Sequence, residues 1–322
     1  GLFRKVADMI TCRHLRSFSP QALSNILWAF ATAKVSRPGL FEKVADELVS
    51  HRDLESFDPE SLSSIAWAFT TAKASNQILL DRIADAAIVR KNGFSAQGIA
   101  NILWSFSSSG LVQSQTLLFE SMAPRVAALL DQCSSQHLAN IAWSYAVANV
   151  DSTILFNSTF TDVLLEKMDT FNSVLLCQLY QWHLWQKEEL SAVLGLPSAF
   201  EKQCYDAFVS KKVHVSIYHK EVISALRSLG LDPKEEVLTP KGFSLDAFVE
   251  VDGKEVGVRV DGPHLFMGRA RGAPVGRTSL KRRLVANVEG IVLVSIPHWV
   301  WKKLGGDCFK HQNYLRDQLG MM

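Results

Sequence analysis

Six basic side chains and no acidic one lie between Gly262 and Val288. They are Arg269, Arg271, Arg277, Lys281, Arg282 and Arg283. Planar guanidinium groups bind phosphate through two parallel hydrogen bonds, so residues of this type suit contact with a polyanion. A run of charge is often only a solvated helix face, but the lack of any acid in this run favours phosphate contact. We therefore expect these side chains to bind phosphate groups.

A second set of polar side chains recurs at helical spacing earlier in the chain. A Gln and an Asn four residues apart share one helix face, and this occurs at Gln21 and Asn25, Gln97 and Asn101, and Gln136 and Asn140. Such a row could contact nucleotide bases, or it could form a ladder of hydrogen bonds between neighbouring helices. The Asn position hardly varies, since only Ser64 departs from it in the matching segment. The near-constancy favours the ladder there, because a position that reads bases should vary.

The segments that hold these pairs are repeats of one unit. Trp28, Trp67, Trp104 and Trp143 mark them at spacings of 39, 37 and 39 residues, and a fixed period of about 38 residues is typical of stacked repeats. A Ser or Asp stands where an N-cap belongs before each apolar run. A second periodic stretch follows, so each unit is predicted to be two helices. The tryptophans continue the apolar face, and we expect them in the core rather than as base-stacking platforms.

A different pattern begins after Leu194–Ser198, where Gly and Pro end the helical periodicity. Two β-rich runs, Phe243–Val251 and Val256–Val260, are joined by Asp252–Gly253, which is a strong hairpin signal. Helices are predicted over Lys220–Gly230 and Thr278–Ala286, and a buried strand over Gly290–Ile296. Helices around a short mixed sheet indicate a small α/β domain.

The composition is that of a folded protein, with 48% hydrophobic and 20% charged residues among 322. The five cysteines are scattered and never form CxxC, which disfavours a disulfide scaffold and a zinc site. No uncharged apolar stretch is long enough for a membrane span, so no membrane partner is expected. Residues 1–200 hold 15 basic and 18 acidic residues, whereas residues 201–322 hold 19 and 14. A polyanion would therefore be attracted first to the C-terminal part.

The pattern LxNIxWxF at this period resembles the octotricopeptide and heptatricopeptide repeats of organellar RNA-binding proteins, over roughly residues 1–190. The resemblance implies single-stranded RNA along a concave surface, and related helical arrays read about one base per repeat. It also implies a location in the mitochondrion or the chloroplast. Gly1–Ile10 is similar to the second helix of a unit, so we expect further repeats and a targeting region before Gly1.

The segment from Tyr218 to Leu319 resembles the RAP domain, which is found in many RNA-processing proteins of mitochondria and chloroplasts. The motifs VDGP, LKRRL and SIPxWxW, in that order, carry the resemblance. We therefore predict a helical-repeat array over residues 1–195, a linker or helix over 196–217 and a RAP domain over 218–319. The predicted fold class is an α-helical repeat solenoid followed by a small α/β domain.

RAP domains are similar in pattern to very-short-patch-repair endonucleases of the PD-(D/E)XK class, which hold a divalent cation with acids on adjacent strands. Asp246 matches the first of these acids. The second acid is expected at position 259, and Asp261 lies two residues after it. Arg259 stands where the resemblance expects the second acid, and an arginine cannot ligate a metal. We therefore expect Asp246 and Asp261 to be structural carboxylates, one of them paired with Arg259, with no cofactor. Mg²⁺-dependent RNA cleavage at these two acids is the alternative.

Three functions follow as hypotheses from these patterns. The first is an RNA-binding protein of organellar transcript stabilisation, processing or translation, with RNA-processing or ribosome-associated proteins as partners. The second is a metal-dependent RNA endonuclease. The third is a protein–protein scaffold built on the helical array.

Overall fold

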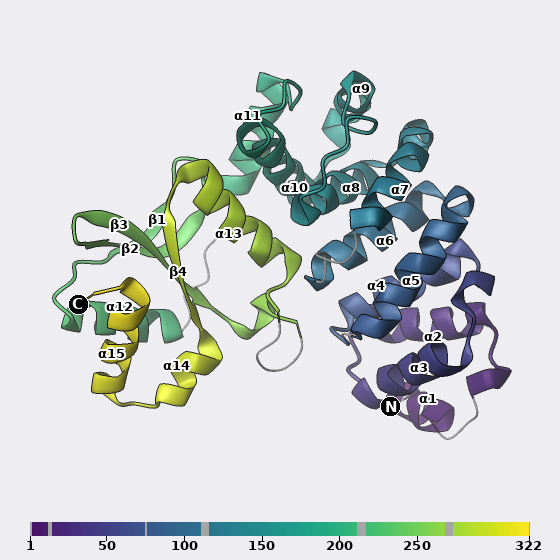
Figure 1. The fold of residues 1–322 in the computed structure, drawn as a ribbon, viewed down its shortest axis with the longest axis horizontal. Coiled ribbons are helices and arrows are strands. Elements are labelled where there is room, and N and C mark those ends of the chain that lie inside the picture. The colour runs from purple at the N-terminus through teal and green to yellow at the C-terminus, as the bar shows by residue number, and fades with distance from the viewer. Residues whose placement is uncertain are drawn as a thin grey trace.

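The computed structural model describes residues 2–11, 15–74, 76–110, 116–210, 217–267 and 273–321. Among these residues the chain is helical as far as Ser228, and a small four-stranded sheet with further helices follows. Figure 1 shows the helical part and the sheet-containing part side by side. No helix in the described ranges has the length and apolarity that a membrane crossing requires.

The helical part consists of two layers. The first-layer helices pack against one another in chain order and are α2 (Pro20–Thr32), α4 (Pro59–Thr71), α6 (Ala96–Ser109), α8 (Ser135–Ala148) and α10 (Ser173–Leu184). The second-layer helices are α3 (Pro38–His51), α5 (Gln77–Arg90) and α7 (Thr116–Ala127). Helix α1 (Leu2–Thr11) packs on α3, and α9 (Ser158–Glu166) precedes α10. This arrangement agrees with a two-helix unit repeated along the chain.

The start of each repeat is fixed locally by its capping residue. Ser19, Asp58, Ser95 and Ser134 each accept a hydrogen bond from the backbone N–H three residues on. These bonds satisfy donors that a helix leaves unpaired at its first turn, and they confirm the N-caps predicted from the sequence. The apolar residues that follow, such as Leu23 and Leu27, are fully buried between the two layers.

The sheet has the order β1-β2-β3-β4. Its strands are β1 (Lys234–Leu238), β2 (Ser244–Val251), β3 (Lys254–Asp261) and β4 (Val292–Pro297). The first three are antiparallel, and β4 runs parallel to β3. Asp252 and Gly253 both have positive φ at the β2–β3 turn, as a two-residue hairpin requires. The sheet is therefore mixed, as predicted, although β1 was not predicted.

Helices cover both faces of the sheet. Helix α13 (Gly276–Glu289) lies on one side, and α12 (Ile217–Ser228), α14 (His298–Leu304) and α15 (Cys308–Leu319) lie on the other (Figure 1). Helix α11 (Ser198–Val209), within the predicted linker, packs on α10, and its Phe200 and Cys204 are fully buried. The packed core of the helical part therefore continues into the predicted linker.

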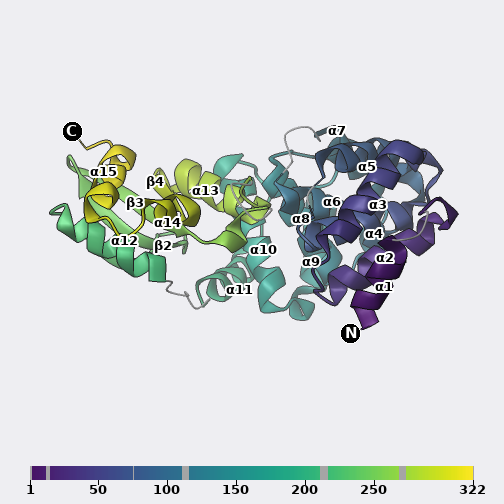
Figure 2. The same cartoon turned by 90° about the horizontal axis from the view of Figure 1, so that it is seen from below.

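The two parts meet through α13, which Figure 2 shows beside α10 and the ends of the first-layer helices. Leu280, Leu284 and Val285 of α13 belong to the same buried cluster as the repeat core. Gly276 lies so close to α6 that a Cβ on it would overlap the Ser107 carbonyl oxygen. Arg283 donates to the carbonyl oxygen of Val147 at 3.2 Å and to that of Ala146. The α/β domain is thus docked on the carboxyl ends of α6 and α8.

Candidate nucleic-acid interface

The Gln and Asn row lies on the face of the first-layer helices that points away from the second layer. Gln21, Asn25, Gln97 and Gln136 are exposed, and Asn101 and Asn140 are half-buried. At the last of these positions the ladder predicted from the sequence is present, because Gln178 Nε2 of α10 donates to Asn140 Oδ1 at 3.1 Å. The Gln position therefore remains open to a ligand along the row, whereas the Asn position serves helix packing in at least one repeat.

The tryptophans lie on the same face, and the expectation that all of them are core residues is wrong. Trp143 is 5% exposed and donates from Nε1 to Gln181 Oε1 at 2.9 Å, whereas Trp28 is 50% exposed. Trp67 and Trp104 are half-buried, and the Trp28 and Trp67 rings lie 6.4 Å apart with a 32° tilt. Each ring lies at the edge of the apolar face of its helix, so its exposed fraction depends on how far the next first-layer helix covers it. A row of partly open aromatic faces therefore follows the Gln row.

The basic cluster of α13 does not present one surface. Arg277 is exposed, and it donates to the His264 carbonyl oxygen at 3.1 Å. Arg282 donates to Asp261 and to Ser295 Oγ, and Arg283 to Glu189 and the end of α8. Successive residues of a helix point about 100° apart, so neighbours in sequence reach different surroundings. Arg269 and Arg271 lie outside the described residues.

Lys281 is also directed inward, where it donates to the Ser244 carbonyl oxygen. Burial, and then the charge of Arg259, lowers the pKa of Lys281 to about 7. A lysine with this pKa carries only part of its charge at neutral pH. Of the four described members of the basic cluster, Arg277 is the one placed for contact with a phosphate in solution, and Arg282 and Arg283 are engaged by protein acceptors.

Asp261 is the centre of a buried polar cluster. Its side chain is 0% exposed, and it accepts from Arg259 Nε at 3.0 Å, from Arg282 and from Ser295 Oγ. Both carboxylate oxygens are therefore occupied by donors, two of them cationic. Ser295 is the first residue of the SIPxWxW motif, but the motif by itself does not predict that its hydroxyl group reaches Asp261.

Asp246 has a separate set of partners. His219 Nδ1 lies 3.0 Å from Asp246 Oδ1, and the Val260 N–H donates to Asp246 Oδ2 at 2.9 Å. Within the ranges that the structure describes, no group of three or more His, Cys, Asp or Glu side chains is arranged to hold a metal ion. The divalent cation implied by the nuclease resemblance does not fit, because guanidinium groups occupy the oxygens of Asp261 that it would need.

The model of one protein family, described as the RNA-editing substrate-binding complex 6 protein, matches residues 2–168. The chain belongs to the RNA-editing substrate-binding complex 6 protein family. No curated protein matches the chain. The matched residues include α1 to α9, and so they hold the Gln row and all four marker tryptophans. The α/β domain and its buried carboxylates lie outside the match.

Proposed function

We propose that this chain binds single-stranded RNA along the exposed face of the first-layer helices, within an assembly that handles RNA-editing substrates. The observation that carries the proposal is the row of exposed Gln21, Gln97 and Gln136 beside partly open Trp28, Trp67 and Trp104. The name of the family describes a complex that binds RNA-editing substrates. Amide side chains carry both a donor and acceptors for base edges, and aromatic faces stack on bases.

The finer parts of the proposal rest on the resemblances of the sequence. They are an array similar to octotricopeptide or heptatricopeptide repeats over residues 1–195, a linker or helix over 196–217 and a RAP domain over 218–319. We place the protein in the mitochondrion or the chloroplast, with RNA-processing or ribosome-associated proteins as further partners. Residues 1–200 carry a net charge of −3, so the α/β domain supplies phosphate contacts, with Arg277 its exposed described candidate and Arg269 and Arg271 still predicted.

Replacing Gln21, Gln97 and Gln136 together by alanine should weaken RNA binding about tenfold or more. One net hydrogen bond contributes roughly 0.5–1.5 kcal/mol, and about 1.4 kcal/mol is tenfold in affinity. The measurement is fluorescence anisotropy with a labelled single-stranded RNA. The matched control removes three exposed glutamines away from the row, Gln77, Gln132 and Gln318. Equal affinity of both triple variants would show that the row is not the RNA surface.

The nuclease alternative predicts that the protein cleaves RNA when Mg²⁺ or Mn²⁺ is present, whereas the binding proposal predicts no cleavage. Labelled RNA incubated with the protein and Mg²⁺ or Mn²⁺ should remain intact, because Asp261 is held by two arginines and Asp246 by His219 and a backbone N–H. Denaturing gel electrophoresis over a time course measures the cleavage. Metal-dependent cleavage that disappears in Asp246→Ala would establish the nuclease instead.

The scaffold alternative would be favoured if crosslinking in cells recovered proteins but no RNA.

A further inference from the structure

The carboxyl ends of the first-layer helices form a second periodic feature. Lys34, Lys73, Gly110 and Asn149 follow α2, α4, α6 and α8 at equivalent repeat positions, and all have positive φ between 53° and 71°. A left-handed residue after a helix is a common way to end it, although glycine or asparagine usually takes the place. Two consecutive repeats instead use lysine, which places a flexible cation beyond the end of each helix.

The α/β domain lies across these helix ends. Gly110 faces the Pro274 carbonyl, and Lys73 Nζ donates to the His264 carbonyl oxygen at 3.3 Å. Arg277 donates to the same oxygen at 3.1 Å. A cation of the repeats and a cation of the α/β domain are therefore held on one neutral oxygen atom. In the ranges that the structure describes, neither of them forms an ion pair with a carboxylate.

This arrangement leaves positive charge uncompensated at the seam. Burial lowers the pKa of Lys73, and the charge of Arg277 lowers it further. Burial, followed by the charges of Arg277, Lys73 and Arg259, also lowers the pKa of the His264 side chain, with Asp261 opposing them. Lys73 and Arg277 both lie within hydrogen-bond distance of the His264 carbonyl oxygen, so their positive charges repel each other. An anion placed between these two cations would be stabilised by both. The site is accessible, since Lys73, His264 and Arg277 are all exposed.

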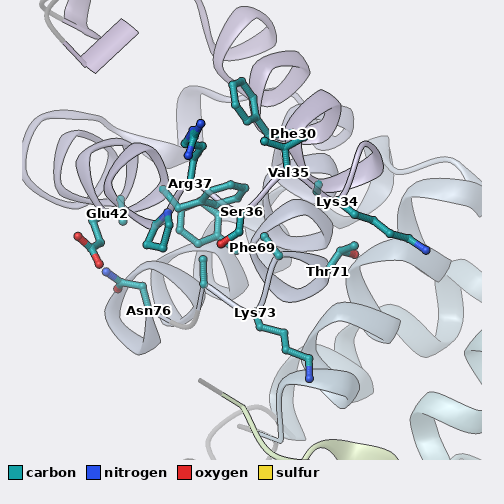
Figure 3. Close-up of a pocket in the computed structure, with 16 residues that line it drawn as sticks. Phe30, Lys34, Val35, Ser36, Arg37, Glu42, Phe69, Thr71, Lys73 and Asn76 are labelled. Carbon is teal, nitrogen blue, oxygen red and sulfur yellow. The ribbon is translucent and has the colours of Figure 1, made fainter. Parts of the chain in front are cut away.

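A cavity of about 620 Å³ next to Lys73 extends the positive surface along the repeats. It lies between the α2–α3 and α4–α5 connections, and its charged lining residues are Lys34, Arg37, Lys73 and the single acid Glu42. Figure 3 shows Lys73 extending from this cavity toward the pale-green segment of the α/β domain. The remaining lining is mostly apolar and includes Phe30, Phe41 and Phe69. Its cations come from two connections, because Lys34 and Arg37 follow α2 and Lys73 follows α4, so a polymer with spaced anionic groups suits it better than an isolated ion.

We infer that the seam is a composite phosphate site for RNA, in which Lys73 of the repeats and Arg277 of α13 clasp one phosphodiester over the His264 carbonyl. The inference rests on the proposed RNA-binding function, and it adds that one strand passes from the repeats onto the α/β domain without a break. No pattern in the sequence marks Lys73, because only the docking of the two parts brings it to Arg277.

The test uses the full chain and a labelled single-stranded oligouridylate, with anisotropy measured over a series of salt concentrations. Lys73→Gln and Arg277→Gln should each weaken binding about three- to tenfold and reduce the slope of log affinity against log salt. A phosphate contact on a single strand contributes about 0.7 to that slope. Because both cations serve one phosphate, the double variant should lose less than the product of the two single losses.

Lys254→Gln removes an exposed lysine at the β2–β3 turn and should change neither the affinity nor the slope. Lys73→Arg retains the charge and should keep most of the affinity, which separates loss of charge from misfolding if Lys73→Gln lowers the melting temperature. Wild-type affinity and slope in both Gln variants would overturn the composite site, as would single losses that multiply. If the wild-type chain itself fails to bind the oligouridylate, the proposed function fails, and the seam inference fails with it.

Discussion

Replacing Asp261 by alanine should destabilise the α/β domain by about 3–5 kcal/mol, the range for breaking a buried ion pair by removing one partner. Asp261 is fully buried and accepts from Arg259, Arg282 and Ser295. Its removal leaves two guanidinium groups near one another in a partly desolvated region with no counter-charge. Urea unfolding followed by circular dichroism would measure the change.

The matched control is Asp252→Asn at the exposed hairpin turn, where φ is +51°. Asparagine tolerates this conformation as aspartate does, so the free energy of unfolding should change by no more than about 0.5 kcal/mol. Asp261→Asn keeps the shape of the side chain but loses its charge, and it should lie between the two. A loss below about 1 kcal/mol in Asp261→Ala would mean that the arginines are solvated elsewhere and that Asp261 is not their anchor.

Gly276→Ala should separate the α/β domain from the repeats. An alanine Cβ at this position would overlap the Ser107 carbonyl oxygen of α6, and backbone atoms cannot give way as a flexible side chain can. Extra volume in a packed contact costs about 1–3 kcal/mol. In an unconstrained helix the same change would raise the free energy of unfolding by roughly 0.5–1 kcal/mol. A tight contact with α6 and a loose one therefore predict stability changes of opposite sign.

Small-angle scattering and thermal unfolding together measure this effect. We expect a larger radius of gyration and a lower melting temperature for Gly276→Ala. Gly306→Ala is the control, because nothing lies within 4 Å of the added Cβ and Gly306 has no positive φ. A melting temperature raised by Gly276→Ala, with no change in the radius of gyration, would show that the contact with α6 is loose. Loss of docking would also remove the contact between Lys73 and the α/β domain, and so weaken RNA binding at the seam.

Local features of both parts of the fold could be predicted from the sequence. The N-caps Ser19, Asp58, Ser95 and Ser134 and the Asp252–Gly253 turn depend on residues a few positions apart, so their chemistry is visible in the chain itself. The period of the tryptophans indicated the two-helix unit, because each repeat packs mainly on its neighbours. The α/β character also followed from local patterns, whereas β1, a mostly exposed edge strand, has no clear apolar alternation.

The candidate site was predictable only in part. The exposed Gln row follows from helical periodicity, but the burial of each tryptophan depends on whether a following helix covers it, as α10 covers Trp143. The six basic residues of the C-terminal cluster were expected to share one role. The tertiary structure instead gives Arg282 to a buried carboxylate and Arg283 to the end of α8, because residues on different sides of α13 face different neighbours.

The sequence by itself thus determined the repeat, its caps and the β2–β3 hairpin of the α/β domain, since these depend on interactions between residues near in the chain. Only the tertiary structure decided which charges remain available to a ligand. Lys73 and Arg277 are far apart in sequence, and they meet on the His264 carbonyl because Gly276 allows α13 to approach α6 closely. No local pattern encodes that approach, because it depends on how two surfaces from distant parts of the chain fit together.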